Sequence, residues 1–399
     1  MDPLVARGQA VMTPNYRPAP IVLDHGQGVW VWDTEGRRYL DMVSGIAVSA
    51  LGHNHPDLVA SVSRQAGRLL HTSNLYWNQA SIELAEALVE TSFGDKVFFC
   101  SSGAEANEAC IKLARRFQWQ RDPRRNQILS FRNSFHGRTM GALTATAQPK
   151  YHEGFGPLPE GFVYGEVGQD PSELIGSATA AVIVEPVQGE GGVRPVPVSY
   201  LQALRARCDE VGALVIVDEV QAGVGRTGDM YAYMASEIRP DLMALAKGVG
   251  GGLPLGALVA RSEVAEALQP GTHGTTYGGS PIACAGALVV MEAVRSPGFL
   301  ENVKARGEEL LAGLRAIDAR RHCFSEVRGR GLMVGADLRP RLGFDAKAIV
   351  DGARGQGVLV HVAGPRTLRM VPPLVIESDH VEQALGAVDA CIGALLQAG

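Results

Sequence analysis

Residues 242–260 read LMALAKGVGGGLPLGALVA, and Lys247 provides the only polar side chain in this stretch. Burial in such apolar surroundings disfavours the charged ammonium form, so we expect a lowered pKa and a nucleophilic neutral amine. Buried lysines of this kind form Schiff bases with carbonyl groups. A membrane span is disfavoured by the glycines, the proline and the lysine. Most lysines in apolar sequence extend their ammonium group to solvent at the end of a strand. For Lys247, only features elsewhere in the chain favour a buried, reactive amine over this alternative.

Short apolar stretches on either side of this segment alternate with helical ones. The stretches are residues 97–100, 128–131, 181–184, 214–217, 242–246 and 255–260, and the helices between them include 58–70 and 82–91. Continuous apolar runs separated by helices are typical of a parallel sheet covered on both faces. The last run follows its predecessor after a loop too short for a crossover helix, so we expect it to be antiparallel. The pattern predicts an α/β fold.

The two ends of the chain show different patterns. Residues 20–42 alternate apolar and polar positions around glycines, as in a short β-meander. From about residue 282, amphipathic helices over 281–295 and 300–319 accompany short strands near 328–337 and 368–375. We therefore predict a large α/β domain of residues 51–280 and a small α+β domain of residues 281–399, with residues 1–50 packing against the small domain.

Composition excludes several classes of function. With 399 residues, 46% hydrophobic residues, 20% charged residues and a net charge of -5, the chain resembles an ordinary globular protein without an electrostatic preference for nucleic acid or anionic membranes. Its six cysteines lack metal-binding spacing, so we expect buried free thiols, no disulfide framework and no metal site. The first residues lack a signal pattern, and the expected location is the cytoplasm.

Polar residues follow three of the predicted strands. Ser101–Glu108 has the serines and early acids of a helix start, whose free N–H groups can hold a phosphate. Asp218 ends the 214–217 run, where a buried carboxylate needs a partner such as a pyridinium nitrogen. Asp218 and Lys247 are 29 residues apart, close to one β-α-β repeat, so they end neighbouring parallel strands. Either motif alone fits an ordinary helix cap, but together they meet the requirements of pyridoxal phosphate.

A glycine motif points to a competing interpretation. Residues 223–228, GVGRTG, match the dinucleotide-binding fingerprint. That fingerprint opens a helix directly after a strand, whereas here residues 218–222 intervene. An NAD-dependent dehydrogenase therefore remains only a remote alternative.

Taken together, these residues resemble the class III aminotransferases, which act on ω-amino groups. The resemblance covers nearly the whole chain in order. Its motifs are LDMVSGIAV (40–48), LGHNHP (51–56), HTSN (71–74), SFHGRT (134–139), EPVQGEGG (185–192), DEVQ (218–221), LAKG (245–248), HGTTYGG (273–279), RGRGL (328–332), and LR (368–369) ahead of PPL (372–374).

The resemblance implies the type I fold of pyridoxal-phosphate enzymes, with a mostly parallel seven-stranded sheet, helices on both faces and a smaller α+β domain. It also implies a homodimer with shared active sites. The implied reaction moves the δ-amino group of N2-acetyl-L-ornithine, or a similar N-acylated diamino acid, to 2-oxoglutarate, giving a semialdehyde and L-glutamate for arginine biosynthesis. Succinylornithine, succinyl-diaminopimelate, ornithine and 4-aminobutyrate remain open as donors, and so does a mutase that needs no 2-oxoglutarate.

The resemblance assigns roles to individual residues. Lys247 would bond the cofactor's aldehyde carbon and carry a proton, and Asp218 would keep the pyridine nitrogen protonated. The other implied cofactor contacts are Ser102, Gly103 and Ala104 at the phosphate, Phe135 and Val220 on the ring faces, Gln221 at the ring hydroxyl, and the partner subunit's Thr276 at the phosphate. The implied substrate contacts are Thr275, Arg138, Arg369 and Glu190.

Arg369 would receive the α-carboxylate of glutamate or 2-oxoglutarate, and Glu190 would neutralise it in the other half-reaction. A movable glutamate suits a site that binds an amine donor and a dicarboxylate in turn, since a permanently unpaired buried arginine is costly. The chain departs from the family at Ala104, where threonine is frequent, and at Ser280, where asparagine is usual. We expect these departures to weaken cofactor binding and to leave the chemistry at Lys247 intact.

Overall fold

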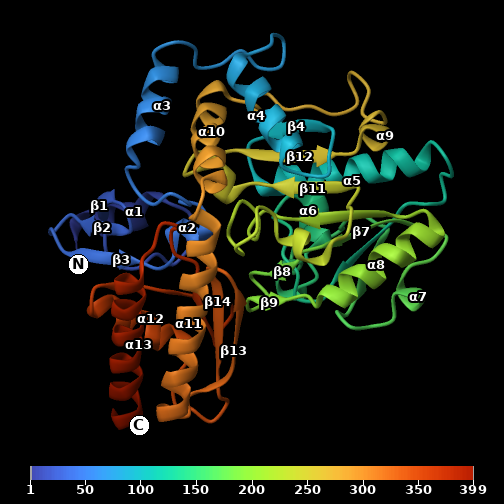
Figure 1. Cartoon of the computed structure of the whole chain (residues 1–399). Coiled ribbons are helices and arrows are strands. Elements are labelled where there is room, and N and C mark those ends of the chain that lie inside the picture. Colours follow the sequence, from blue (N-terminus) through green and yellow to red (C-terminus); the bar gives the residue numbers. More distant parts are fainter. Residues whose placement is uncertain (1, 399) are drawn as a thin grey trace.

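The computed structural model describes residues 2–398, and a seven-stranded sheet lies at its centre (Figure 1). The strands, in spatial order, are β4 (Lys96–Cys100), β12 (Gly256–Ala260), β11 (Leu242–Leu245), β10 (Leu214–Asp218), β7 (Thr179–Val184), β5 (Gln127–Phe131) and β6 (Phe162–Gly165). All neighbouring strands pair in parallel except at β12, which is antiparallel to both β4 and β11. The predicted α/β fold and the antiparallel strand after the Lys247 loop are confirmed. Strand β6 was not predicted, because its residues form no buried apolar run.

The central strands are apolar throughout because both of their faces are covered. Every residue of β7, β10, β11 and β12 is buried. Successive side chains point to opposite faces. Ile216 and Leu242 join a cluster with helix α5 (Gly103–Trp119), whereas Val217 and Met243 join the larger cluster on the other face. The helices that contribute to that larger cluster include α4 (Gln79–Glu90), α8 (Val198–Val211) and α10 (Pro281–Arg295).

A second, antiparallel sheet lies in the C-terminal part of the chain (Figure 1). Its strands, in spatial order, are β13 (Phe324–Arg330), β14 (Met333–Leu338), β17 (Thr367–Met370) and β16 (His361–Val362). Helices α11 (Phe299–Arg321) and α12 (Ala346–Gly355) pack on this sheet, and α13 (Ser378–Ala398) packs on those two helices. One face of this sheet is left to meet the large sheet's loops.

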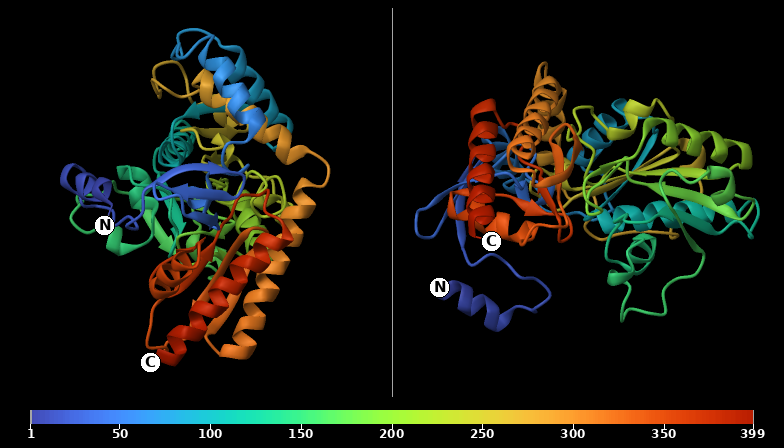
Figure 2. Two further views of the ribbon diagram at one scale, coloured as in Figure 1. Left: turned by 90° about the vertical axis from the view of Figure 1, so that its left-hand side faces the viewer. Right: turned by 90° about the horizontal axis from the view of Figure 1, so that it is seen from below.

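The N-terminal strands join the C-terminal part of the chain. The third sheet comprises β1 (Leu23–Gln27), β2 (Trp30–Asp33), β3 (Arg38–Asp41) and β15 (Val358–Leu359). Strand β15 pairs in parallel with β3, and Figure 2 shows the blue N-terminal strands beside the red C-terminal region. The domain boundaries remain a prediction. Because α10 packs on α3 (Pro56–Ala66) and α4, we propose the second boundary at residues 296–298, between α10 and α11.

The remaining elements are short. They are α1 (Pro3–Val11), α2 (Ser44–Ala47), α6 (Met140–Ala145), α7 (Pro171–Leu174), α9 (Ser262–Ala265), the strand pair β8 (Val187–Gln188) and β9 (Arg194–Pro195), and the 3-10 turns η1 (Pro149–Tyr151), η2 (Ala232–Ser236) and η3 (Lys247–Gly250). All six cysteines are buried and free, as predicted. Between residues 2 and 398, no single helix is long and apolar enough to cross a membrane; α10 and α11 meet those criteria only as a pair bent by 74°.

A buried carboxylate fixes the start of β11. Asp241 is 3% exposed and accepts hydrogen bonds from Arg205 Nη1 at 2.5 Å, Arg261 Nη1 at 2.8 Å and the Val215 N–H at 2.8 Å. These donors come from α8, the end of β12 and β10. The Asp241 side chain therefore connects the start of β11 to α8, to β10 and to the end of β12.

Replacement Asp241→Asn should lower the free energy of unfolding by about 3 kcal/mol, because it breaks a buried charge pair and leaves two arginines without their carboxylate. Urea-induced unfolding followed by circular dichroism measures this change. Glu90→Gln is the matched control, since Glu90 pairs with Arg295 at the exposed surface. The control should cost no more than about 1 kcal/mol. Equal losses in both variants would contradict the role given to Asp241.

Candidate active site

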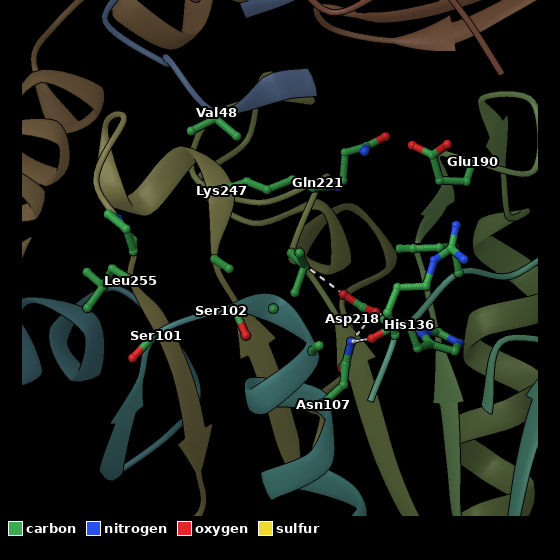
Figure 3. A pocket seen from close by; sticks show the side chains of 18 of the residues that line it. Val48, Ser101, Ser102, Asn107, His136, Glu190, Asp218, Gln221, Lys247 and Leu255 are labelled. Atoms are coloured by element: carbon green, nitrogen blue, oxygen red, sulfur yellow. Dashed lines mark hydrogen bonds and ion pairs between the residues drawn. The ribbon is translucent and has the colours of Figure 1, made fainter. Parts of the chain in front are cut away.

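A cavity of about 450 Å³ opens where the parallel strands end, and Figure 3 shows its lining. Ten of the predicted site residues line it: Ser102, Gly103, Ala104, Phe135, Arg138, Glu190, Asp218, Val220, Gln221 and Lys247. Arg369 lies behind the wall and contacts Glu190. Thr275 lines two separate surface pockets, and Thr276 is exposed. The single chain thus brings together every predicted site residue except Thr275 and Thr276.

Lys247 follows β11 directly and lies in the cavity. Strand β11 pairs in parallel with β10, so Lys247 and Asp218 share one edge of the sheet, as predicted. Figure 3 shows the lysine side chain running toward Gln221 above Asp218. The backbone of Lys247 has φ 49°, a left-handed conformation that costs a non-glycine residue free energy and that clusters at functional sites. The unfavourable backbone conformation therefore occurs at the residue whose side chain lines the cavity.

The electrostatic surroundings of Lys247 favour its neutral amine. Burial is the largest influence and lowers the pKa of Lys247; Glu190 raises it in part, Arg369 lowers it further, and Asp218 and Glu185 raise it. The net result is a pKa below the usual value for lysine. A neutral amine beside an accessible cavity is a nucleophile for carbonyl carbon.

Three donors fix the Asp218 carboxylate. Its Oδ2 accepts from Asn107 Nδ2 at 2.8 Å and from His136 Nδ1 at 2.7 Å, and its Oδ1 accepts from the Val220 N–H at 3.0 Å. Asn107 Nδ2 also donates to the backbone oxygen of His136 at 2.7 Å, which locks the two residues together. The side chains of Asp218, Asn107 and His136 are all buried. The carboxylate consequently has one orientation toward the cavity.

The start of α5 lines one part of the cavity. Ser102 caps the helix by accepting from the Glu105 N–H, and Glu105 accepts from the Ser101 N–H. The N–H groups of Gly103 and Ala104 belong to the first turn and have no acceptor within the helix. A Cβ at Gly103 would lie 2.6 Å from Val220 Cγ1, so only glycine allows this approach. Because the side chain of Ala104 has no hydroxyl group, an anion bound here must be held by backbone N–H groups.

Glu190 and Arg369 form an ion pair at the cavity wall. Arg369 is fully buried, and its Nη1 donates to Glu190 Oε1 at 2.6 Å. Burial acts to raise the pKa of Glu190, but Arg369 and Lys247 outweigh it and the pKa is lowered. Within residues 2–398, Arg369 Nε and Nη2 have no hydrogen-bond partner. The guanidinium group thus keeps capacity for a second carboxylate.

Residues 223–228 do not form a dinucleotide site. They make a succession of turns, and no helix starts there. Arg226 within the motif is buried and donates to the backbone oxygens of Leu332 and Pro372, so the motif docks against the small sheet. The fingerprint match has a structural explanation, and the dehydrogenase alternative is wrong.

Comparison with known proteins agrees with this geometry. Residues 11–392 match the family described as Aminotransferase class-III. The chain belongs to the class III aminotransferases.

An acetylornithine aminotransferase from Xylella fastidiosa is 49% identical over 95% of this chain and 94% of its own length. A succinylornithine transaminase from Yersinia pseudotuberculosis is 44% identical over 94% and 92%. The solved ornithine aminotransferase of Toxoplasma gondii, which holds PLP at partial occupancy in its active site, superimposes with a TM-score of 0.94 at 30% identity, over 99% of this chain and 94% of that one.

Sequence reasoning missed three buried residues of this class III site. Asn107 and His136 hold Asp218, and Glu185 accepts from the Phe135 N–H at 2.9 Å and the Gly189 N–H at 3.2 Å. Burial raises the pKa of Glu185 to about 7. Asn107 could have been predicted as a buried polar residue, because it interrupts the apolar face of α5 beside Ala106 and Cys110. His136 and Glu185 lie within the family motifs of residues 134–139 and 185–192, but no local sequence pattern predicts the hydrogen bonds that they make.

Another buried acid supports the Asp218 segment from behind. Glu219 is 1% exposed and accepts from the N–H groups of Ala232 and Tyr233 at 2.9 and 2.7 Å. Burial raises its pKa to about 7. Because the folded-state pKa lies above the unfolded value, its contribution to stability is complete below about pH 4.5 and is lost as the pH rises through 7.

Replacement Glu219→Gln removes this titration. The stability of wild type relative to the variant should therefore fall by about 2–3 kcal/mol between pH 5 and pH 8. Urea unfolding at several pH values measures the difference, with the exposed Glu35→Gln as the control for loss of a surface carboxylate. A difference that does not change with pH would show that Glu219 is ionised throughout this range.

Proposed function

We propose that this protein transfers the δ-amino group of N2-acetyl-L-ornithine to 2-oxoglutarate, with pyridoxal phosphate as cofactor, in arginine biosynthesis. The products are L-glutamate and the N-acetylated semialdehyde. One observation carries the proposal: a fully buried arginine, Arg369, is paired with Glu190 on the wall of the cavity that holds Lys247. Relatives named for acetylornithine and succinylornithine, which are 49% and 44% identical, support a donor of the N-acylornithine type.

The cavity fits pyridoxal phosphate. Asp218 offers an oriented carboxylate to a pyridinium nitrogen, and the first turn of α5 offers N–H groups to a phosphate. Phe135 and Val220 line the cavity as apolar walls suited to the two faces of a ring. Gln221 Oε1 has no hydrogen-bond partner among the described residues, which leaves it available to a ring hydroxyl. When bound, this cofactor supplies an electron sink for cleavage of a bond at the substrate's amine-bearing carbon.

Lys247 would provide the amine that holds the cofactor and the nitrogen that carries a proton to and from the substrate carbon. Burial lowers the pKa of Lys247, which favours the neutral form of the amine that can accept a proton from the substrate carbon. Asp218, held by Asn107 and His136, keeps the proton on the ring nitrogen, because an oriented carboxylate in a buried site favours a cation beside it. The two residues come from neighbouring parallel strands, so the sheet fixes their separation.

Glu190 and Arg369 let one site accept two kinds of substrate. While the amine donor is bound, Glu190 neutralises Arg369. When a dicarboxylate arrives, Glu190 moves aside and Arg369 binds the α-carboxylate through its planar fork. Its Nη2 and Nε, which have no partner among the described residues, supply donors for that carboxylate. We assign the other substrate carboxylate to Arg138. This residue is exposed at the cavity, and its Cζ lies 4.1 Å from the centroid of the Tyr151 ring.

We further propose a homodimer in which the partner subunit's Thr276 completes the phosphate site. Thr276 is exposed in the single chain and does not line the cavity, and Thr275 beside it accepts from Asn74 Nδ2 at 2.9 Å. Large apolar side chains lie exposed in the same region, namely Leu70, Leu75, Tyr76, Trp77 and Tyr277. An apolar surface of this kind suits a protein interface. The six free thiols support a reducing compartment, and we propose the cytoplasm.

A panel of amine donors tests the acyl group of the proposed substrate. Acetyl and succinyl groups differ in size and charge at the far end of the substrate, and a few apolar contacts discriminate by only about 1–3 kcal/mol. Single-turnover rates with acetylornithine, succinylornithine, succinyl-diaminopimelate, ornithine and 4-aminobutyrate should place acetylornithine first. A reaction that runs without 2-oxoglutarate would indicate a mutase instead.

Replacement Lys247→Ala should abolish transamination, with a loss of at least about 10³-fold in kcat, since it removes both the nucleophile and the proton carrier. The purified variant should lack the visible absorbance of a lysine-bound cofactor while its circular dichroism spectrum is unchanged. Full turnover in this variant would overturn the mechanism.

Replacement Glu190→Gln should separate the two half-reactions. Without its carboxylate partner Arg369 stays charged and free, so dicarboxylate binding should tighten about tenfold while the donor half-reaction slows by a similar factor. Stopped-flow measurement of each half-reaction tests this, and Glu190→Asp is the control that keeps the charge. Equal effects on both half-reactions would argue against an exchange of partners at Arg369.

A further inference from the structure

One row of residues crosses all four strands of the small sheet. Arg328 in β13 lies opposite Gly335 in β14, Gly335 lies opposite Arg369 in β17, and Arg369 lies opposite His361 in β16. Residues directly opposite one another in a sheet point to the same face, with Cβ atoms about 5 Å apart. Arg328, Arg369 and His361 therefore share one face, and glycine takes the remaining position.

This face meets the turn that carries Glu190. Arg328 donates to the backbone oxygens of Gly192 and of Val193, the latter at 3.1 Å. A Cβ at Gly335 would lie 2.9 Å from Val193 Cβ, so glycine lets the turn settle on the sheet. Arg369 then binds Glu190 itself. His361 is the last position of the row, on the edge strand, and it lies past Arg369.

His361 has Arg369 and Glu190 as its charged neighbours. It is partly buried, and burial lowers its pKa, Arg369 lowers it further, and Glu190 raises it. The charged groups on the other elements beside β16 already pair with one another: Lys347 and Arg354 with Asp351 on α12, and His53 with Asp41 at β3. Apart from burial, the charge on the imidazole therefore depends on Arg369 and Glu190.

We propose that His361 is a specificity-determining residue for the dicarboxylate half-reaction, a second cationic position beside Arg369 that becomes charged when a substrate carboxylate enters. This inference rests on the exchange of partners at Arg369 proposed above. The charge count gives its direction. Arg369 and Glu190 alone sum to zero, whereas Arg369, a displaced Glu190 and an incoming carboxylate sum to minus one. A protonated imidazole compensates that excess charge and so favours the dicarboxylate-bound state.

Proton linkage makes the proposal measurable. Without a dicarboxylate the lowered pKa leaves His361 neutral near pH 7. The added negative charge raises the pKa, so binding takes up a proton on the acid side of neutrality. A unit charge about 6 Å away is sufficient to change affinity about tenfold between pH 8 and pH 6. The amine-donor half-reaction brings no such excess at Arg369 and should lack this dependence.

The experiment uses the cofactor-loaded enzyme and glutarate, a five-carbon dicarboxylate with no keto or amino group to react. Titration calorimetry in buffers of different ionisation enthalpy gives the protons taken up, at pH 6, 7 and 8. The test variant is His361→Asn. The matched control is His322→Asn, because His322 is exposed and has φ 52°, a conformation that asparagine adopts readily.

Wild type and His322→Asn should bind glutarate about tenfold more tightly at pH 6 than at pH 8, with proton uptake, and His361→Asn should lose most of both effects. The KM for 2-oxoglutarate at pH 6 should rise in His361→Asn alone, with the KM for acetylornithine unchanged. Equal proton uptake in His361→Asn and wild type would overturn the role of His361. Failure of wild type to transaminate acetylornithine at any pH would instead refute the proposed function.

Discussion

A parallel sheet buried on both faces has only its strand ends available for polar chemistry, and this constraint organises the whole site. Strand β10 is apolar up to its last residue, Asp218, and β11 is apolar throughout, so Asp218 and the first polar residue after β11, Lys247, meet at one edge. Water is displaced there by apolar side chains, so each charge depends on a protein partner. Asp218 has three donors, and Arg369 has Glu190.

The small sheet completes the site from the opposite side. It places Arg369 behind the cavity wall, against Glu190, and holds the Glu190 turn through Arg328. Glu185, buried under the same turn, binds the N–H groups of both Phe135 and Gly189. A displacement of the Glu190 turn is therefore mechanically connected to the aromatic wall of the cavity. The two substrates of the proposed reaction act on one connected piece of structure.

The sequence predicted those parts of the molecule that depend on local patterns. Lys247 and Asp218 could be placed on neighbouring strands because apolar runs and a β-α-β spacing are properties of short stretches. Strand β6 escaped notice because an edge strand is only partly buried and needs no continuous apolar run. His136, Asn107 and Glu185 escaped notice because their partners are distant in the chain. Arg369 was placed by family resemblance, and its cross-strand neighbour His361 required the register of the small sheet.

The pairing of β3 with β15 has a consequence for how this chain is made. Strand β3 is complete at residue 41, yet the partner that covers its edge is residues 358–359. On the ribosome, almost the entire polypeptide must emerge before that edge is covered. An unpaired strand edge invites association with other chains, and such long-range pairing is slow. During synthesis the edge of β3 thus stays uncovered for a prolonged stage. In that stage a chaperone bound to the first fifty residues would prevent association with other chains.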